Sequence, residues 1–206
     1  MGASEEVHVC WTIDCEATQE AISDIKMGVR SIRGFVELLA EAGLKGTLFV
    51  LPSDAVAYPV LLRELASQGL EIGLHYHPQE EGHRDFCGAY SEIEQMVMYS
   101  EATTKLSDSV GFQPRTFRTG SCSANDATFP VTEELGYTSC SHSMPGRNMA
   151  NLRSNWVGAP HNPHFTHAAN RLLPGSMDLV EVPITTDPDS MLWSGGHAQD
   201  LPVELF

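Results

Sequence analysis

The chain has 206 residues, of which 42% are hydrophobic and 19% are charged. This composition predicts one globular domain with its own hydrophobic core, and it excludes a disordered chain, a coiled coil and a collagen-like chain. Only 12 Lys and Arg residues accompany 27 Asp and Glu residues, so the formal net charge is −15. We expect no nucleic-acid partner, because binding to phosphates requires a basic surface.

Hydrophobic periodicity predicts strands and helices that alternate along the chain. In order, the predicted elements are a buried strand at 7–14, a helix at 23–42, a strand at 46–51, a helix at 53–68, a strand at 70–75, a helix at 91–106, a strand at 115–119, a helix at 125–135, and strands at 137–142 and 179–185. Ser91 and Glu94 predict a capping box (S-x-x-E) at the start of the helix at 91–106. Repeated strand–helix units with short links predict a parallel α/β sheet, either open and doubly wound or closed into a barrel. Residues 143–178 break this alternation, and we expect a long functional or mobile loop there.

The N-terminal residues lack the basic and apolar regions of a secretory signal peptide, and no stretch of about 18 apolar residues could span a membrane. The five cysteines are odd in number and show no CxxC spacing, which is typical of reduced thiols. We therefore expect a cytoplasmic protein with no membrane partner, unless a signal peptide has been removed from the sequence.

Polar side chains follow the predicted strands at the points where the strands end. They are Asp14 and Glu16 after the first strand, His75 and His77 after the third, Arg118 after the fourth, His142 after the fifth and Asp187 after the last. The carboxyl ends of parallel strands meet at one face, where α/β proteins build their sites. The sequence therefore predicts a functional site at this face.

The two histidines of this set stand at positions i and i+2. On an extended segment, His75 and His77 project to the same side and can share a metal ion. A carboxylate from a neighbouring strand would complete a two-histidine, one-carboxylate set with open positions for water and substrate. The alternative is that both histidines make ordinary hydrogen bonds at the end of a strand.

Asp14 and Glu16 offer two carboxylates at the end of a hydrophobic strand. One can bind the metal while the other takes a proton from water, and the residues alone leave the assignment open. Otherwise Asp14 caps the next helix and Glu16 is solvated. Cys15 lies between them and should point away from the site into the packing. Arg118 can orient a carboxylate through two parallel hydrogen bonds, unless it forms a surface ion pair.

Five further histidines are weaker candidates. Three of them recur every three residues, namely His161, His164 and His167. They could form a second metal cluster, contact the substrate or simply line a loop. His142 and His197 are single histidines, and either could serve as a general acid.

In this order the motifs resemble those of the polysaccharide deacetylase family of carbohydrate esterases, which includes chitin and peptidoglycan deacetylases. The matching segments are Thr12-Ile13-Asp14-Cys15-Glu16, then Glu71-Ile72-Gly73-Leu74-His75-Tyr76-His77-Pro78, then Phe117-Arg118-Thr119-Gly120. The resemblance covers most of residues 7–187. Each motif is weak alone, and the ordered set is specific.

The resemblance implies an irregular (β/α)7 barrel in which residues 1–206 form a single catalytic domain. It implies a metal-dependent hydrolase, with zinc as the expected divalent ion, that removes an acetyl group from an N-acetylated sugar or oligosaccharide. Carried over by motif, Asp14 is the general base, Glu16, His75 and His77 are the metal ligands, and Arg118 holds the base. The family's late histidine motif has no clear match in this chain, and only His197 is placed to serve as the general acid.

Two departures bear on this assignment. The family commonly has two adjacent aspartates and histidines at i and i+4, whereas this chain has Cys15 between its acids and histidines at i and i+2. Asp14 and Glu16 could therefore exchange roles. The alternatives to sugar deacetylation are hydrolysis of a small amide metabolite on the same fold and a non-catalytic sugar-binding protein. The sequence stops soon after the strand at 179–185, so we expect a barrel that is open on one side, closed by a partner chain in an oligomer, or truncated at its C-terminus.

Overall fold

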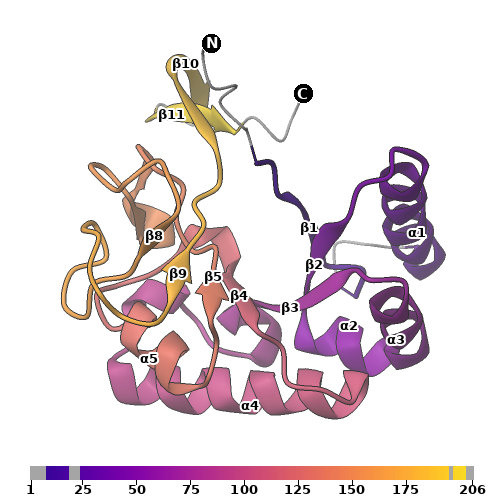
Figure 1. Ribbon diagram of the computed structural model, residues 1–206. Helices are drawn as coiled ribbons and strands as arrows, with labels where there is room; N and C mark the ends of the chain where they lie inside the picture. The colour runs from indigo at the N-terminus through magenta and orange to yellow at the C-terminus, as the bar shows by residue number, and fades with distance from the viewer. Residues whose placement is uncertain (1–7, 19–23, 195–196, 203–206) are drawn as a thin grey trace.

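Five parallel strands lie side by side in the order in which they occur along the chain. The computed structural model describes residues 8–18, 24–194 and 197–202; for Ile25, 187–194 and 197–202 it describes the backbone alone. The strands in sheet order are β1 (Trp11–Cys15), β2 (Gly46–Val50), β3 (Glu71–Tyr76), β4 (Thr116–Thr119), β5 (Ser139–Cys140), β9 (Val180–Glu181) and β8 (His164–Phe165). β9 continues the parallel series, and β8 pairs antiparallel to β9 at the far edge. Figure 1 shows these strands as an arc that is open on one side.

The helices run along the outer side of this curved sheet (Figure 1). They are α1 (Ile25–Glu41), α2 (Pro52–Ala57), α3 (Pro59–Ser67), α4 (Glu92–Val110) and α5 (Thr128–Glu134). α4 begins at the predicted capping box, in which the Ser91 hydroxyl accepts from the Glu94 amide and the Glu94 carboxylate accepts from the Ser91 amide. It ends at Gly111, whose φ of 87° is the left-handed conformation that closes helices at little cost.

The single helix predicted at 53–68 is wrong, because the structure splits it into α2 and α3. Tyr58 lies between them with φ −128° and ψ 43°, outside the helical region. A residue before proline is disfavoured in the helical conformation, while Pro59 suits the first turn of a new helix. The Tyr58–Pro59 pair therefore causes the break.

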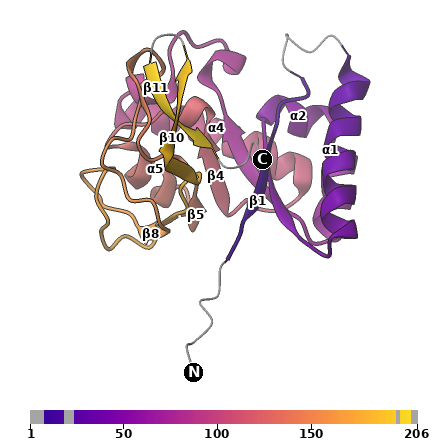
Figure 2. The same ribbon diagram turned by 90° about the horizontal axis from the view of Figure 1, so that it is seen from above.

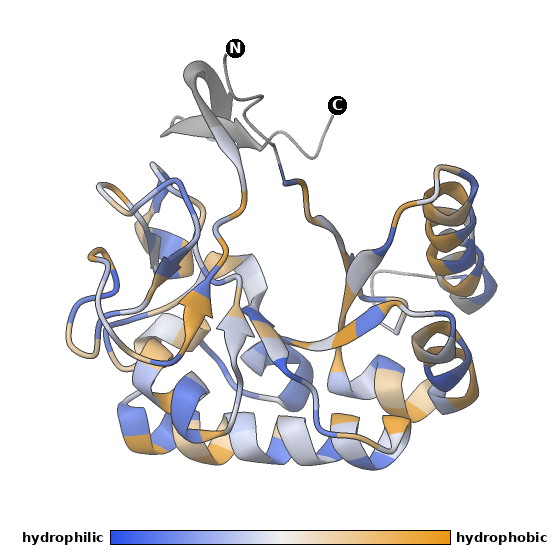
Figure 3. Ribbon diagram, viewed as in Figure 1, coloured by the Kyte–Doolittle hydropathy of each residue, from blue (hydrophilic) through white to orange (hydrophobic). Residues whose placement is uncertain are grey.

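The core lies between the sheet and its helices. Leu48, Val50, Leu74 and Phe117 from the strands are fully buried, and Leu62, Tyr99 and Leu106 from the helices pack on them. Figure 3 shows α1 with hydrophobic and hydrophilic residues on different sides, as the helical periodicity predicts. No helix in the described part of the chain is long and apolar enough to cross a membrane.

The predicted buried strand at 7–14 is corrected in both length and burial. β1 begins at Trp11, which is 42% exposed, and within the described residues it pairs only with β2. An edge strand has one unpaired side, so its side chains lack neighbours there. The predicted strands at 137–142 and 179–185 shorten to the two-residue strands β5 and β9.

The segment at 143–178 contains more order than the sequence predicted. It includes the antiparallel pair β6 (Asn148–Met149) and β7 (Ser154–Asn155), as well as β8. An unpredicted hairpin follows, formed by β10 (Thr186–Ser194) and β11 (His197–Pro202). The α/β class with a parallel sheet is confirmed, and the described strands do not close into a ring, as the view from above shows (Figure 2).

Candidate metal and catalytic site

Glu16, His75 and His77 meet at the carboxyl ends of β1 and β3. These two strands flank β2 in parallel, so both end at the same edge of the sheet. The Glu16 Oε1 atom lies 2.9 Å from His75 Nε2 and 3.0 Å from His77 Nε2, and the two Nε2 atoms are 3.1 Å apart. Among the described residues, this is the only group of three metal-type side chains whose ligand atoms lie this close together.

The protonation of His75 suits a metal ligand. Its Nδ1 atom lies 3.0 Å from the carbonyl oxygen of Arg118, which can only accept, so Nδ1 carries the proton in that bond. In the neutral ring the Nε2 lone pair therefore faces Glu16 and His77, and a backbone bond of this kind is the usual support for a metal-binding histidine. Two imidazole nitrogens and a carboxylate oxygen directed at one point form a donor set that fits a divalent cation.

The electrostatics of the trio favour positive charge at this point. Burial alone would raise the pKa of the Glu16 carboxyl, but its contacts with the ring nitrogens of His75 and His77 outweigh burial and hold the pKa well below its usual range. Burial alone would lower the pKa of His75, yet the carboxylates of Asp14 and Glu16 raise it overall. A cation bound between these groups would satisfy the same attraction.

The backbone after β4 forms a wall against the His77 ring. A side chain placed on Gly120 would lie 2.4 to 2.5 Å from three ring atoms of His77, so only glycine fits this contact. The next residues, Ser121 and Cys122, have φ values of 55° and 50°, a strained left-handed turn. Trp156 Nε1 holds this turn with a 2.7 Å hydrogen bond to the carbonyl oxygen of Cys122. The turn, held by Trp156 from the loop at 143–178, therefore supports the candidate ligand His77.

Arg118 lies inside the protein and holds Asp14. Its Nη1 donates to Asp14 Oδ1 at 2.8 Å, and its Nη2 donates to Thr12 Oγ1 at 3.0 Å and Ser141 Oγ at 2.9 Å. Its side chain is buried, and the guanidinium stacks on the Phe49 ring at 4.1 Å, which excludes a surface ion pair.

The contact between Arg118 and Asp14 differs from the prediction in one detail. A single nitrogen meets a single oxygen, so the two parallel bonds expected from the sequence are not formed. The second oxygen, Asp14 Oδ2, remains free of Arg118 and lies 3.7 Å from His75 Nε2. The carboxylate therefore reaches from the arginine toward the histidine pair.

The surroundings of His142 exclude it as the general acid. Its Nδ1 accepts from the Thr119 amide at 3.1 Å, so the proton is on Nε2, which lies 3.2 Å from Thr132 Oγ1. The ring is fully buried, and burial above all lowers the pKa of His142 to about 4. Both nitrogens are engaged, and the imidazole is neutral near pH 7.

The other histidines do not join the described cluster. His197 begins β11, and its side chain lies outside the part of the chain that the structure describes. His164 Nδ1 lies 2.9 Å from the carbonyl oxygen of Asn162, and His167 Nδ1 accepts from the Ala169 amide at 3.1 Å. Local loop contacts thus replace the second metal cluster among the described residues.

Cys15 faces the packing, as the alternation along β1 predicted. Its side chain is buried, and burial raises the pKa of the thiol far above its ordinary value, so it is not a thiolate ligand.

Three residues of the site were assigned no role from the sequence, although two of them stand in the quoted motifs. Thr12 stands two residues before Asp14 on the same face of β1, and this spacing could have revealed it. Ser141 and Gly120 carry no local signal, because only the neighbouring strands bring them to Arg118 and His77.

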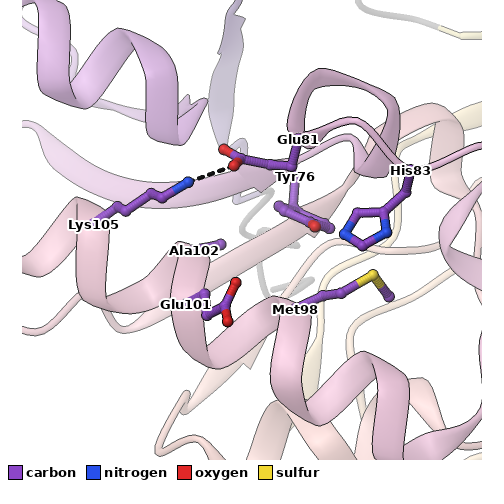
Figure 4. A pocket seen from close by; sticks show the side chains of 7 residues that line it. All are labelled: Tyr76, Glu81, His83, Met98, Glu101, Ala102 and Lys105. Atoms are coloured by element: carbon purple, nitrogen blue, oxygen red, sulfur yellow. Dashed lines mark hydrogen bonds and ion pairs between the residues drawn. The ribbon is translucent and has the colours of Figure 1, made fainter.

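A hollow lies between α4 and residues 76–83 (Figure 4). Its cavity of about 50 Å³ is lined by Tyr76, Glu81, His83, Met98, Glu101, Ala102 and Lys105. Lys105 forms an ion pair with Glu81 at its side. This space suits a few water molecules and adds no group to the Glu16–His75–His77 cluster.

Comparison with known proteins gives one family and several structures. The family described as Polysaccharide deacetylase matches residues 23–140. No curated protein matches the chain significantly. A structure from Mycobacterium smegmatis named for the polysaccharide deacetylases is 21% identical, with a TM-score of 0.58 over 85% of this chain and 58% of the other.

Two further structures show the same fold. One from Pseudomonas aeruginosa PAO1, also named for the polysaccharide deacetylases, is 20% identical with a TM-score of 0.55, over 81% of this chain and 48% of the other. The structure named Puue allantoinase is 18% identical with a TM-score of 0.55 over the same shares. The chain thus spans about half the length of these structures.

Proposed function

The chain belongs to the polysaccharide deacetylase family, and from this premise we propose that it is a metal-dependent hydrolase that removes an acetyl group from an N-acetylated sugar or polysaccharide. One arrangement carries the proposal: the Arg118–Asp14 pair lies directly beside Glu16, His75 and His77. A carboxylate held next to a cation-binding set is what hydrolysis of an amide needs, because water must lose a proton as it attacks.

The metal would be held by Glu16, His75 and His77, and we propose zinc. Such an ion, when bound, lowers the pKa of water and polarises the substrate carbonyl. Glu16 takes the ligand role because its Oε1 lies within 3.0 Å of both Nε2 atoms, whereas the Oδ2 of Asp14 lies 3.7 Å from His75.

Asp14 is the proposed general base. Arg118 occupies Oδ1 and leaves Oδ2 free, so the free oxygen is the one that accepts the proton of the attacking water. Thr12 and Ser141 hold the guanidinium on its other nitrogen, which keeps Asp14 in place without a further charge. His197 stays our proposal for the group that protonates the leaving amine.

A second candidate function is hydrolysis of a small amide metabolite by the same groups. The likeness in fold to the structure named Puue allantoinase supports this second candidate. The two candidates share the metal and the base and differ only in substrate, so a substrate panel separates them.

The test combines metal content with activity. The purified protein is loaded with zinc, and hydrolysis of N-acetylglucosamine oligomers and of allantoin is measured together with the zinc content. We expect one zinc per chain and release of acetate from the oligomers. His77→Ala should lose both zinc and activity, whereas His161→Ala, which removes an exposed histidine of the loop, should retain both.

The outcomes are distinct. Less than about half a zinc per chain after loading would contradict both enzyme functions, since each needs the metal to activate water. Full zinc with hydrolysis of allantoin alone would favour the small-amide function. Full zinc without hydrolysis of either substrate would favour a sugar-binding protein.

A further inference from the structure

Glu181 is a buried carboxylate, and no Lys, Arg or His side chain in the described part of the chain forms a hydrogen bond or ion pair with it. It lies on β9, its residue is fully buried, and it faces the end of β5, the neighbouring strand in Figure 1. Taking a carboxylate out of water is costly unless hydrogen bonds replace its hydration. Glu181 is neither a proposed metal ligand nor the proposed base, so the proposed function does not explain why a carboxylate is buried here.

The carboxylate is satisfied by three residues that surround Ser141. Oε2 accepts from the Cys140 thiol at 3.0 Å and the His142 amide at 3.1 Å, and Oε1 accepts from the Ser143 amide at 2.7 Å and the Ser143 hydroxyl at 2.6 Å. β5 ends at Cys140, so the sheet no longer orders the amides of His142 and Ser143. Glu181 supplies the acceptors that a longer strand pairing would have supplied.

Ser141 links this grip to the site. Its backbone is anchored by a 2.9 Å bond from its amide to the carbonyl of Phe117, and its hydroxyl accepts from Arg118 Nη2 at 2.9 Å. Arg118 in turn holds Asp14 through Nη1 at 2.8 Å. The sequence of contacts therefore runs from Glu181 through the segment around Ser141 to the guanidinium and then to Asp14.

We propose that Glu181 is a positioning residue, which sets the position of Arg118 and Asp14 by fixing the chain on both sides of Ser141. The inference rests on the proposed function for its catalytic consequence. Glu181 does not hold the proposed metal ligands, because its hydrogen bonds go to Cys140, His142 and Ser143.

The test uses Glu181→Gln in the zinc-loaded protein. The amide has nearly the same shape, but one of its ends donates and would face the donors of residues 140–143. We expect kcat to fall about tenfold or more, since hydrogen bonds to charged groups are worth roughly one to two powers of ten in rate. KM and zinc affinity should stay within about twofold, because neither depends on this contact set.

A second readout is independent of activity. The guanidinium protons of Arg118, followed by NMR with ¹⁵N-labelled arginine, report whether the side chain is held. We expect their signals to broaden in Glu181→Gln and in Ser141→Ala. Glu133→Gln is the matched control, because the hydrogen bond that the Glu133 carboxylate accepts comes from the Asp178 amide and not from the Ser141 segment. It should leave kcat and the signals unchanged.

Several results would overturn the proposal. Wild-type kcat together with unchanged Arg118 signals in Glu181→Gln would show that Glu181 does not position Arg118. A loss of kcat that parallels a loss of zinc affinity would show that the variant acts through the metal site instead. If Glu181→Gln does not fold, Ser141→Ala decides, and wild-type kcat and unchanged signals in that variant would remove the link. If the wild-type protein hydrolyses no substrate, the proposed function fails, while the Arg118 signals still test the positioning.

Discussion

Gly120→Ala should weaken metal binding without touching a ligand atom. The added methyl group would lie 2.4 to 2.5 Å from Nδ1, Cδ2 and Cε1 of His77, whereas ordinary contact begins at 3.4 Å. To restore ordinary contact, the His77 ring must move by about 1 Å. Metal–ligand distances in proteins vary by only about 0.2 Å, so a shift of this size disturbs the bond from His77 to the metal. The turn itself cannot easily retreat, since Trp156 and Ser154 both bond the carbonyl oxygen of Cys122.

The expected size of the effect follows from this displacement. Disturbing the support of a ligand typically costs about 10- to 100-fold in metal affinity. We expect a loss of this order, or about 1.4 to 2.8 kcal/mol, for zinc bound to Gly120→Ala. Competition with a coloured zinc chelator at pH 7 measures it directly.

Gly34→Ala is the matched control for this substitution. Gly34 lies within α1, and a methyl group there would meet nothing within 4 Å. Alanine favours a helix over glycine by up to about 1 kcal/mol, so this variant should be at least as stable as the wild type and bind zinc equally. Wild-type zinc affinity in Gly120→Ala would refute the reasoning, because it would show that the wall behind His77 yields freely.

Three further variants test the base, its holder and the buried histidine. Asp14→Asn should keep zinc affinity within about threefold and lower kcat by about 100-fold or more, as loss of a general base does; loss of zinc in this variant would mean that Asp14 is the ligand and Glu16 the base. Arg118→Lys should lower kcat about tenfold with zinc retained, because one ammonium group cannot replace the fork that meets Asp14 and two hydroxyls; unchanged kcat would contradict the positioning of Asp14. The pKa of His142 falls from 6.5 to about 4 on folding, so between these pH values only the unfolded chain binds the proton, and stability is lost as pH falls below 6.5. Urea unfolding at pH 7 and pH 5 should show that the wild type loses about 2 kcal/mol more free energy of unfolding than His142→Gln over this pH range. Equal losses in both proteins would contradict the low pKa of the buried His142.

Local rules predicted the elements that depend on neighbours in the sequence. The capping box at Ser91 formed as expected, and the alternation of strands and helices produced the parallel sheet. His75 and His77 came to one side because i and i+2 share a face in any extended segment. The helix break at Pro59 was equally available from the sequence, since the conformational limit on Tyr58 is local.

Burial could not be predicted in the same way. Trp11 belongs to a hydrophobic run, yet it is exposed because β1 lies at the edge of the described sheet. The run of residues is the same in an edge strand and in a central one; the number of neighbouring strands is a property of the whole fold.

The candidate site likewise has features that follow from the sequence and features that depend on the fold. Which residue types gather at the strand ends can be read from the chain, because every parallel strand ends at the same edge. Which atoms meet cannot: Arg118 bonds Asp14, 104 positions away, and Ser141, 23 positions away. Glu181 and Gly120 matter only through partners on other strands. Periodicity encodes the face on which a side chain lies, whereas atomic contacts depend on the packing of segments that are distant in the chain.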